Sequence, residues 1–305
     1  MSTPSAALAP AARRRSGRRR QGHNLAPYLF CAPFLLLFAV FFVLPIIYAL
    51  GQSLFLDRGT ESLFVGLDNY GRVLHDSAFF ASIGRVLLFG IVQAPLSLIL
   101  AVVLALLLDS RVVVGKAFFR LAFFVPYAVP GVVAVLMWGY LYSPDLSVIT
   151  QMAHAVKLST PDFLGPDTLL WSIANIVTWE YTGYNMIVLY SVLQSIPQDL
   201  YEAARIDGCG GLGVAWHIKI PLLRRGLVLT AVFSIIGTLQ LFAEPQILAT
   251  MTSVDDAYTP TLYAYNYAFS YSAFNYSAAI SFVLALVSFV ASYGFLRLMQ
   301  RGQEA

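Results

Sequence analysis

Long runs of apolar residues without charges recur along the chain, separated by shorter polar segments. A membrane helix needs about 20 consecutive apolar residues, because the hydrocarbon core of a bilayer is about 30 Å thick. The length of the runs and their lack of strand-like alternation favour helices over barrel strands. The pattern predicts six spans, at residues 28–50, 86–108, 121–142, 168–193, 227–250 and 274–296.

The composition agrees with a membrane protein. Of 305 residues, 58% are hydrophobic and 11% are charged, with a mean hydropathy of +0.71. An ordinary soluble domain carries about 25% charged residues, so a cytosolic globular enzyme and a disordered chain are both excluded. The two cysteines, Cys31 and Cys209, lie too far apart in sequence to suggest a disulfide framework, and the histidines show no metal-ligand spacing. The sequence therefore predicts an all-α integral membrane protein without a metal site.

Lysines and arginines segregate to one side of a six-span arrangement. Arginines crowd the first 24 residues, and further basic residues lie between spans two and three, between spans four and five, and after span six. Cytoplasmic loops carry an excess of these residues, and an odd span count would mix the two sides. We therefore expect both termini in the cytoplasm. Residues 1–24 are predicted to be a disordered basic tail, attracted by anionic membrane lipid, and residues 25–300 the membrane domain.

The polar loop at residues 195–225, between the fourth and fifth spans, is the most informative segment. Pro197 suits a first helical turn, and the spacing of the apolar residues that follow predicts a short amphipathic helix. Glycines between residues 208 and 213 allow a turn, and a second short helical segment at 214–220 is predicted to end at Pro221. On physical grounds alone, a solvated connector explains this loop equally well.

Three sequence motifs resemble one family of membrane proteins. Residues 201–208, Tyr-Glu-Ala-Ala-Arg-Ile-Asp-Gly, with His-Ile-Lys-Ile-Pro-Leu-Leu at 217–223, resemble the EAA loop of binding-protein-dependent ABC import permeases. Residues 64–70, Phe-Val-Gly-Leu-Asp-Asn-Tyr, resemble the first external loop of maltose-type sugar permeases, and residues 120–126 resemble the start of their third span. The resemblance covers about residues 28–300, and it is to the first member of the maltose-type pair. It implies a type I ABC importer transmembrane domain in the inner membrane of a prokaryote.

The resemblance also implies how such a chain is driven. The sequence has no phosphate-binding Gly-x-x-x-x-Gly-Lys-Ser/Thr motif, so ATP and Mg would bind a partner subunit and no cofactor would bind this chain. In the family, the EAA helix sits in a groove of the ATP-hydrolysing subunit, and its movement tilts the membrane helices. Glu202 would make polar contacts there, while Ala203 and Ala204 would pack into the groove. The implied coupling residues are Tyr201, Glu202, Ala203, Ala204, Arg205, Asp207, Gly208 and Pro221.

The implied complex contains several further proteins. These are a second, homologous permease subunit that forms a heterodimer with this chain, two ATP-binding subunits and an external solute-binding protein. Membrane lipid surrounds the complex, and nucleic acid has no part in it.

Two acidic residues fall inside predicted spans, Glu180 in the fourth and Glu244 in the fifth. A charge at the bilayer centre costs at least about 3 kcal/mol on insertion scales, so each should face a cavity, a partner helix or the interface. Their aromatic and amide neighbours are the types that stack on sugar rings and bridge hydroxyls. Packing within the bundle would explain the same residues. The candidate solute-path residues are Trp179, Glu180, Tyr181, Tyr184, Asn185, Gln240, Glu244 and Gln246.

The sequence thus favours the permease subunit of an ATP-driven importer that moves a sugar or oligosaccharide. Permeases for glycerol-phosphate or polyamine-type solutes also carry EAA loops and stay open as alternatives. An ion-coupled secondary transporter is a different class, which usually has more spans and an internal repeat. An integral membrane enzyme is disfavoured, because no cluster of catalytic residues is visible.

Overall fold

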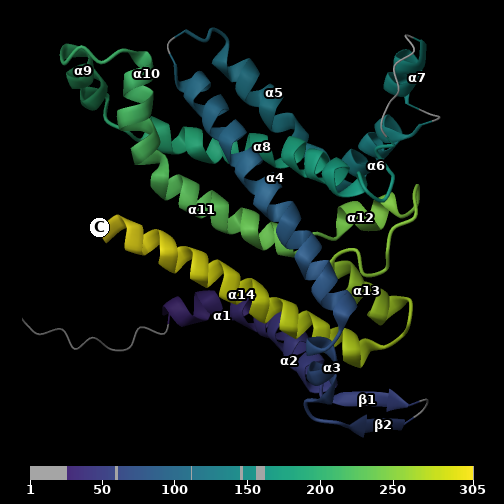
Figure 1. The fold of residues 1–305 in the computed structure, drawn as a ribbon. Helices are drawn as coiled ribbons and strands as arrows, with labels where there is room; N and C mark the ends of the chain where they lie inside the picture. Colours follow the sequence, from purple (N-terminus) through teal and green to yellow (C-terminus); the bar gives the residue numbers. More distant parts are fainter. Residues whose placement is uncertain (1–25, 59–60, 111, 145–146, 156–161, 305) are drawn as a thin grey trace, which may run out of the picture. The chain divides into compact units, whose positions relative to one another are not determined.

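The computed structural model describes residues 26–58, 61–110, 112–144, 147–155 and 162–304, and most of these residues are helical (Figure 1). The predicted basic tail, residues 1–24, lies outside the described residues. The chain divides into two compact units, residues 1–48 and 49–305. The first contains α1 (Ala26–Phe38), the π-helical turn η1 (Ala39–Val43) and the start of α2 (Leu44–Gln52). Its apolar side chains are exposed, as suits a helix that faces lipid.

The second unit is built around two long helices that pack along each other. The helices of this unit are α3 (Asp68–Leu74), α4 (Ser77–Asp109), α5 (Lys116–Ala128), α6 (Gly131–Tyr142), α7 (Val148–Ala155), α8 (Leu169–Gln194), α9 (Gln198–Ile206), α10 (Gly211–Val214), the π-helical turn η2 (Ala215–Lys219), α11 (Ile220–Leu239), α12 (Ala243–Leu248), α13 (Pro260–Phe269) and α14 (Phe274–Glu304). α4 packs along α8, α11 packs against both helices and against α14, and α13 lies on α14. α9 and α10 lie at one end of α8 and α11, whereas α12 and α6 lie at the other (Figure 1).

The pairing of α4 with α8 follows from one face of α4. Phe89, Gln93, Ser97, Ala101 and Ala105 are all buried, and residues four apart share a helix face. The side chains become small from Ser97 onward, which lets α8 approach closely, as is usual between membrane helices. The sequence thus places one amide, that of Gln93, and one hydroxyl, that of Ser97, in the middle of this buried face.

The membrane spans agree only in part with the six that the sequence predicts. Four helical segments among the described residues are long and apolar enough to cross a membrane: Tyr28–Gln52, Ser77–Asp109, Gly211–Leu248 and Phe274–Met299. The pair α5 and α6 forms a fifth if the two helices together make one span. α8 is 26 residues long but is not among these segments, since polar side chains such as Glu180 and Asn185 interrupt its apolar sequence. Six spans therefore stay a prediction.

The predicted third span, residues 121–142, is not a straight helix. α5 and α6 meet at an angle of 93°. Val129 is extended, with φ −72° and ψ 131°, because the ring of Pro130 disfavours the helical conformation of the residue before it. Pro130 also has no N–H with which to continue the helix.

Pro221 does not end a helix, contrary to the sequence prediction. α10, η2 and α11 follow one another without a break, and the π-helical turn covers residues 215–219. Pro221 has no N–H to donate to the preceding turn, and the wider π turn directly before it accommodates this loss. The same arrangement recurs in the first unit, where η1 ends two residues before Pro45.

The predicted fifth span, residues 227–250, is interrupted as well. α11 ends at Leu239, and α12 begins only at Ala243, with Phe242 in a non-helical conformation between them. The segment between the predicted fifth and sixth spans contains the helix α13, whose first turn is capped by Thr259.

The sequence predicts an all-α fold, but the structure also contains a two-stranded hairpin. β1 (Phe55–Arg58) pairs antiparallel with β2 (Glu61–Phe64), and the rings of Phe55 and Phe64 meet edge-on at 5.4 Å. Asn69, at the start of α3, donates from its side chain to the carbonyls of Ser53 and Phe55. These contacts fix a short strand pair that apolar periodicity alone does not reveal.

Candidate functional site

The loop between α8 and α11 presents the short helix α9 at one end of the molecule. Pro197 precedes its first turn, and Gly208 follows its end with a φ of +81°. The amide of Gly208 donates to the carbonyl of Arg205, and the amide of Cys209 donates to that of Ala204. This is the hydrogen-bond pattern of a helix C-terminus closed by a glycine. The glycine lets the chain reverse into α10.

The two faces of α9 differ in what they contact. Tyr201 and Ala204 are 6% and 9% exposed and pack in a buried cluster with Val214, Leu189 and other residues from the ends of the long helices. Ala204 is therefore covered by its own chain, and of the two alanines in the motif only Ala203 faces outward. The other motif residues on the outward surface are Glu202, Arg205, Asp207, Gly208 and Pro221.

Large apolar side chains surround this outward surface. Ile206 is 87% exposed, Leu212 is 90% exposed and Trp216 is 70% exposed. Such a group beside a polar helix is a feature of surfaces that contact another protein. The predicted amphipathic helix is confirmed, but its apolar residues do not all face the chain's own core.

A cavity of about 490 Å³ lies between α4, α5, α8 and α11. Five of the eight residues that the sequence proposes for a solute path line it: Tyr181, Tyr184, Asn185, Gln240 and Glu244. Five further residues of its wall carry polar groups and were not predicted from the sequence: Gln93, Ser97, Tyr127, Ser234 and Thr238. The position of Gln93 and Ser97 four residues apart in an apolar run was the signal that could have identified them.

The polar groups of this cavity are held in place by one another. The Asn185 side-chain amide donates to the Ser97 hydroxyl at 3.3 Å, and that hydroxyl lies 3.3 Å from the hydroxyl of Thr182. The ring of Tyr127 stacks on Tyr184 at 4.8 Å. Amides, hydroxyls and aromatic faces thus share one wall, which suits a small polar solute with apolar ring faces.

The remaining three predicted residues do not line the cavity. Trp179 packs edge-on against Trp138, with the ring centroids 5.7 Å apart. Glu180 is 8% exposed, and one of its carboxyl oxygens lies 3.7 Å from the position that a Cβ on Gly131 would take. Its carboxyl group therefore lies at the start of α6, where the partial positive charge of the helix end favours an acid. Gln246 lies in α12, outside the cavity lining.

A second cavity, of about 580 Å³, lies between the start of α8, the α4 segment around Arg85 and the 253–258 loop. Arg85 donates to the carbonyls of Ala257 and Tyr258 at 3.1 and 2.8 Å, and its guanidinium lies 3.9 Å from Asp255. Trp171, on the wall, is 46% exposed. Arg85 thus ties the 253–258 loop to α4.

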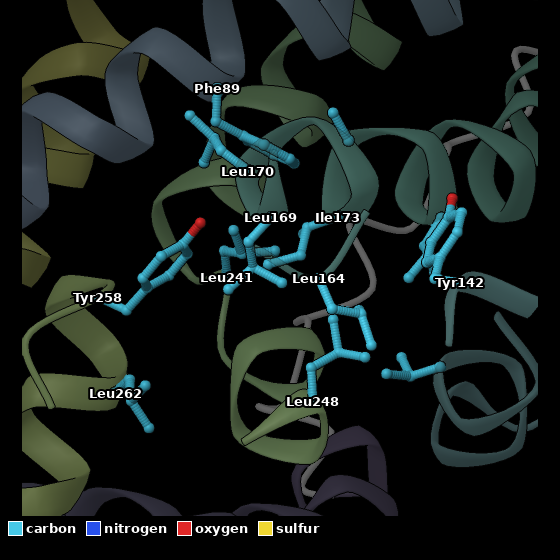
Figure 2. Close-up of a cluster of buried hydrophobic side chains, with 13 residues drawn as sticks. Phe89, Tyr142, Leu164, Leu169, Leu170, Ile173, Leu241, Leu248, Tyr258 and Leu262 are labelled. Carbon is cyan, nitrogen blue, oxygen red and sulfur yellow. The ribbon is translucent and has the colours of Figure 1, made fainter. Parts of the chain in front are cut away.

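One buried cluster supplies walls to both cavities. Figure 2 shows this cluster, in which Phe89 and Leu241 also line the first cavity, while Leu169, Leu170 and Tyr258 line the second. Apolar side chains therefore stand between the two cavities. Among the described residues, there is no group of three or more His, Cys, Asp or Glu side chains that could hold a metal ion.

The chain has recognisable relatives over most of its length. The lactose transport system permease protein LacF of Rhizobium radiobacter is 31% identical over 89% of this chain and 93% of its own. The arabinooligosaccharides transport system permease protein AraP of Bacillus subtilis (strain 168) is 31% identical over 95% of this chain and 94% of its own. The sn-glycerol-3-phosphate transport system permease protein UgpA of Agrobacterium fabrum is 34% identical over 66% of this chain and 69% of its own.

A solved structure shares the fold. It is the crystal structure of a bacterial ABC transporter involved in the import of the acidic polysaccharide alginate, which matches with a TM-score of 0.79 at 19% identity. The match covers 90% of this chain and 95% of that chain. The likeness confirms the type I ABC importer permease fold that the resemblance implied.

Residues 97–302 match the family model described as the binding-protein-dependent transport system inner membrane component. This range contains α8, α9, α11 and most of the first cavity's wall. The chain therefore belongs to the family of inner-membrane components of binding-protein-dependent transport systems, and it is a transport permease component.

Proposed function

We propose that this chain is a permease subunit of an ATP-driven ABC importer that moves a sugar or oligosaccharide into the cytoplasm. The observation that carries the proposal is the 490 Å³ cavity, whose wall combines stacked tyrosines with the amides of Asn185, Gln93 and Gln240. Relatives named for lactose and arabinooligosaccharides, and a structural neighbour named for alginate, support a carbohydrate.

The charge of the cavity wall argues for a neutral solute. None of the described residues that line it is basic, and Glu244 is its one acid. A phosphate ester is normally bound by arginine, lysine or a helix N-terminus, and a polyamine needs several acids. A relative named for sn-glycerol-3-phosphate keeps that solute as the second candidate. The wall composition favours the sugar.

We infer six spans with both termini in the cytoplasm. α8 serves as the fourth span, because its polar residues face the cavity and its neighbouring helices rather than lipid. The bent pair α5 and α6 serves as the third, with its break close to Glu180. Basic residues then gather on the side of α9, as the positive-inside rule requires.

The outward face of α9 is proposed as the contact with the ATP-binding subunits. Ala203 offers a small side chain that fits a groove, Glu202 and Arg205 offer charges beside it, and Leu212 and Trp216 extend the surface. Tyr201 and Ala204 instead anchor the helix to its own chain.

ATP and Mg bind the partner ATP-binding subunits. A second, homologous permease subunit and an external solute-binding protein complete the proposed complex. The structural neighbour in complex with an alginate-loaded periplasmic protein supports the latter.

The partner surface is tested by purifying the tagged chain in mild detergent and identifying the copurifying proteins by mass spectrometry. We expect an ATP-binding protein and a second permease with the wild-type chain. The variant Glu202→Lys with Ala203→Glu should lose the ATP-binding protein but keep the second permease, because a charge of the wrong sign and a larger side chain block the groove. Ser62→Glu, an exposed change on the hairpin, should retain both. Recovery of the chain alone would sink the proposal.

The solute is tested with the purified complex and its binding protein in proteoliposomes. Uptake of radiolabelled lactose, an arabino-oligosaccharide and glycerol 3-phosphate is compared. Asn185→Ala should lower the initial uptake rate of the transported sugar roughly twofold to tenfold, since a hydrogen bond contributes about 0.5–1.5 kcal/mol. Ser191→Ala is the matched control, because Ser191 is exposed on the same helix and its hydroxyl donates to the backbone carbonyl of Ile187, one turn earlier in α8. Uptake of glycerol 3-phosphate alone would favour the second candidate.

A further inference from the structure

Asp109, the last residue of α4, joins the ends of three elements. The ammonium of Lys219, in η2, lies 2.5 Å from one of its carboxylate oxygens. The side-chain amide of Gln194, at the end of α8, donates to the other oxygen at 2.7 Å. The side chains of Lys219 and Asp109 are 14% and 10% exposed, so water screens this ion pair far less than a surface pair.

The same lysine reaches α9. Its ammonium lies 5.2 Å from the ring centroid of Tyr201, a distance at which a cation is attracted to an aromatic face. Tyr201 anchors α9 to the rest of the chain, and its hydroxyl is buried without a hydrogen-bond partner in the described part of the structure. Lys219 is therefore the side chain through which the anchor of α9 meets the carboxylate at the end of α4.

Such a link is needed because the covalent connection at the end of α9 is pliable. The chain leaves the helix through Gly208 and Gly210, which permit a wide range of backbone conformations. The apolar cluster beneath α9 holds it in place, but apolar contacts have no fixed direction and allow sliding. An ion pair with two fixed donors on one carboxylate sets both distance and orientation.

We propose that the Asp109–Lys219 ion pair is a positioning element that makes α9 and the ends of α4 and α8 move as one body. The inference rests on the proposed function, since α9 transmits force only if an ATP-binding subunit contacts it. When the pair is intact, closure of the ATP-binding subunits must carry α4 and α8 along. When it is broken, α9 follows the ATP-binding subunits alone, and ATP is hydrolysed without the restraint of the membrane helices.

The test compares basal ATP hydrolysis by the purified complex in nanodiscs, without added solute. Lys219→Met keeps the length of the side chain and its packing on Tyr201, and Asp109→Asn keeps an acceptor for Gln194. Each should raise basal hydrolysis by roughly fivefold or more, the low end of typical coupling factors between sites. The ATP-binding subunit should still copurify with each variant, although the loss of a little-exposed ion pair should lower the thermal midpoint of the complex.

Three further variants show whether the pair acts as one unit. The double variant Asp109→Asn with Lys219→Met should be no more active than either single variant, because both changes break the same interaction. Lys219→Arg keeps the charge and should keep the low wild-type rate. Lys116→Met, which removes a lysine at the start of α5, is the matched control and should also behave like wild type.

The outcomes separate this inference from the function on which it rests. Absence of an ATP-binding subunit from the wild-type complex overturns both. Copurification of that subunit with unchanged hydrolysis in Lys219→Met and Asp109→Asn overturns the positioning role alone. A lower thermal midpoint with loss of the subunit also overturns it, since the pair then only holds the fold together.

Discussion

Gly183 marks a very close approach of the backbones of α5 and α8. A Cβ added to this residue would lie 1.8 Å from the backbone carbonyl oxygen of Phe123 in α5, far inside van der Waals contact. Only glycine therefore lets α5 rest against α8 at this point, beside the cavity. The close contact also fixes where Tyr127, one turn further along α5, meets Tyr184.

We expect Gly183→Ala to lower the free energy of unfolding. Overpacking typically costs about 1–3 kcal/mol. A backbone atom cannot move aside as a flexible side chain can, so the effect should lie at the upper end or above. Gly294→Ala is the control: it has open space around it in α14, and alanine favours a helix by about 1 kcal/mol over glycine. Thermal midpoints of the detergent-solubilised proteins measure the difference. Equal midpoints for the two variants would contradict the close packing.

Individual site residues could be predicted from the sequence at the two acids inside predicted spans, whose charges are costly in a membrane, and at the neutral residues close to them in sequence. Glu244 stood out because a charge in an apolar run is expensive, and it lines the cavity. Glu180 stood out for the same reason, but its direction towards α6 depends on how α6 packs against α8, which no local pattern contains. Gln93 and Tyr127 were missed because burying a neutral amide or a tyrosine in a membrane span costs little free energy, and neither residue lies beside an acid in the sequence.

At the scale of elements, Asp76 joins the start of α4 to α13 and α14. One of its carboxylate oxygens caps α4 by accepting from the amides of Ala78 and Phe79. The other accepts from the hydroxyls of Tyr263 at 2.7 Å and Tyr276 at 2.9 Å. Partial burial raises the pKa of Asp76, but these hydrogen bonds outweigh it and hold the pKa below its usual 3.8. Burial and the bonds to Tyr267 and Asp76 raise the pKa of Tyr263, so it stays a donor at neutral pH.

The lowered pKa of Asp76 gives a pH dependence with a definite sign. The carboxylate's contribution to stability is complete above the ordinary value of 3.8 and is lost as the pH falls through the lower pKa of the folded state. Asp76→Asn should therefore lower the thermal midpoint at pH 7, and the gap to wild type should narrow as the pH is taken below about 4. Asp199→Asn, at an exposed carboxylate of α9, should show no gap. A gap independent of pH would contradict the role of the charge.

The sequence predicted helical elements better than their breaks. The break between α5 and α6 lies at Pro130, a residue whose effect on the backbone is known, yet the uninterrupted apolar run hid it. The break after Leu239 has no proline or glycine at 240–242 to announce it. Pro221 was predicted to end a helix but does not, because the preceding π turn accommodates its missing N–H. Whether the helix breaks at each of these positions depends on tertiary packing, which the spacing of apolar residues does not reveal.

At the scale of the whole molecule, the exposed apolar surface needs cover. Along α14, for example, Leu286 is 63% exposed, Phe289 66% and Val290 60%. Lipid tails satisfy such side chains without hydrogen bonds, and so does a neighbouring membrane helix. The extent of this surface fits a chain that crosses the membrane repeatedly. It also explains why the polar residues gather on α8, between the other helices.

The topology gives the sharpest test of the whole molecule. Between the hairpin and the α9–α10 turn lie α4, the pair α5 and α6, and α8. If the bent pair crosses the membrane, these make three spans, and the hairpin and the turn lie on opposite sides. If the pair instead enters and leaves on one side, there are two spans, and both segments lie on the same side. One residue in each segment therefore decides between a broken span and a re-entrant loop.

We expect the two segments to lie on opposite sides, with the α9–α10 turn in the cytoplasm. Cysteines at Ser62 and Leu212, both exposed, are introduced singly into a background in which Cys31 and Cys209 are replaced by alanine. A membrane-impermeant maleimide should label Ser62→Cys in intact spheroplasts and Leu212→Cys in inverted vesicles. Labelling of both from the same side would reduce the span count to five and would leave α9 and the hairpin facing one compartment. That result would also contradict the proposed six spans with both termini in the cytoplasm.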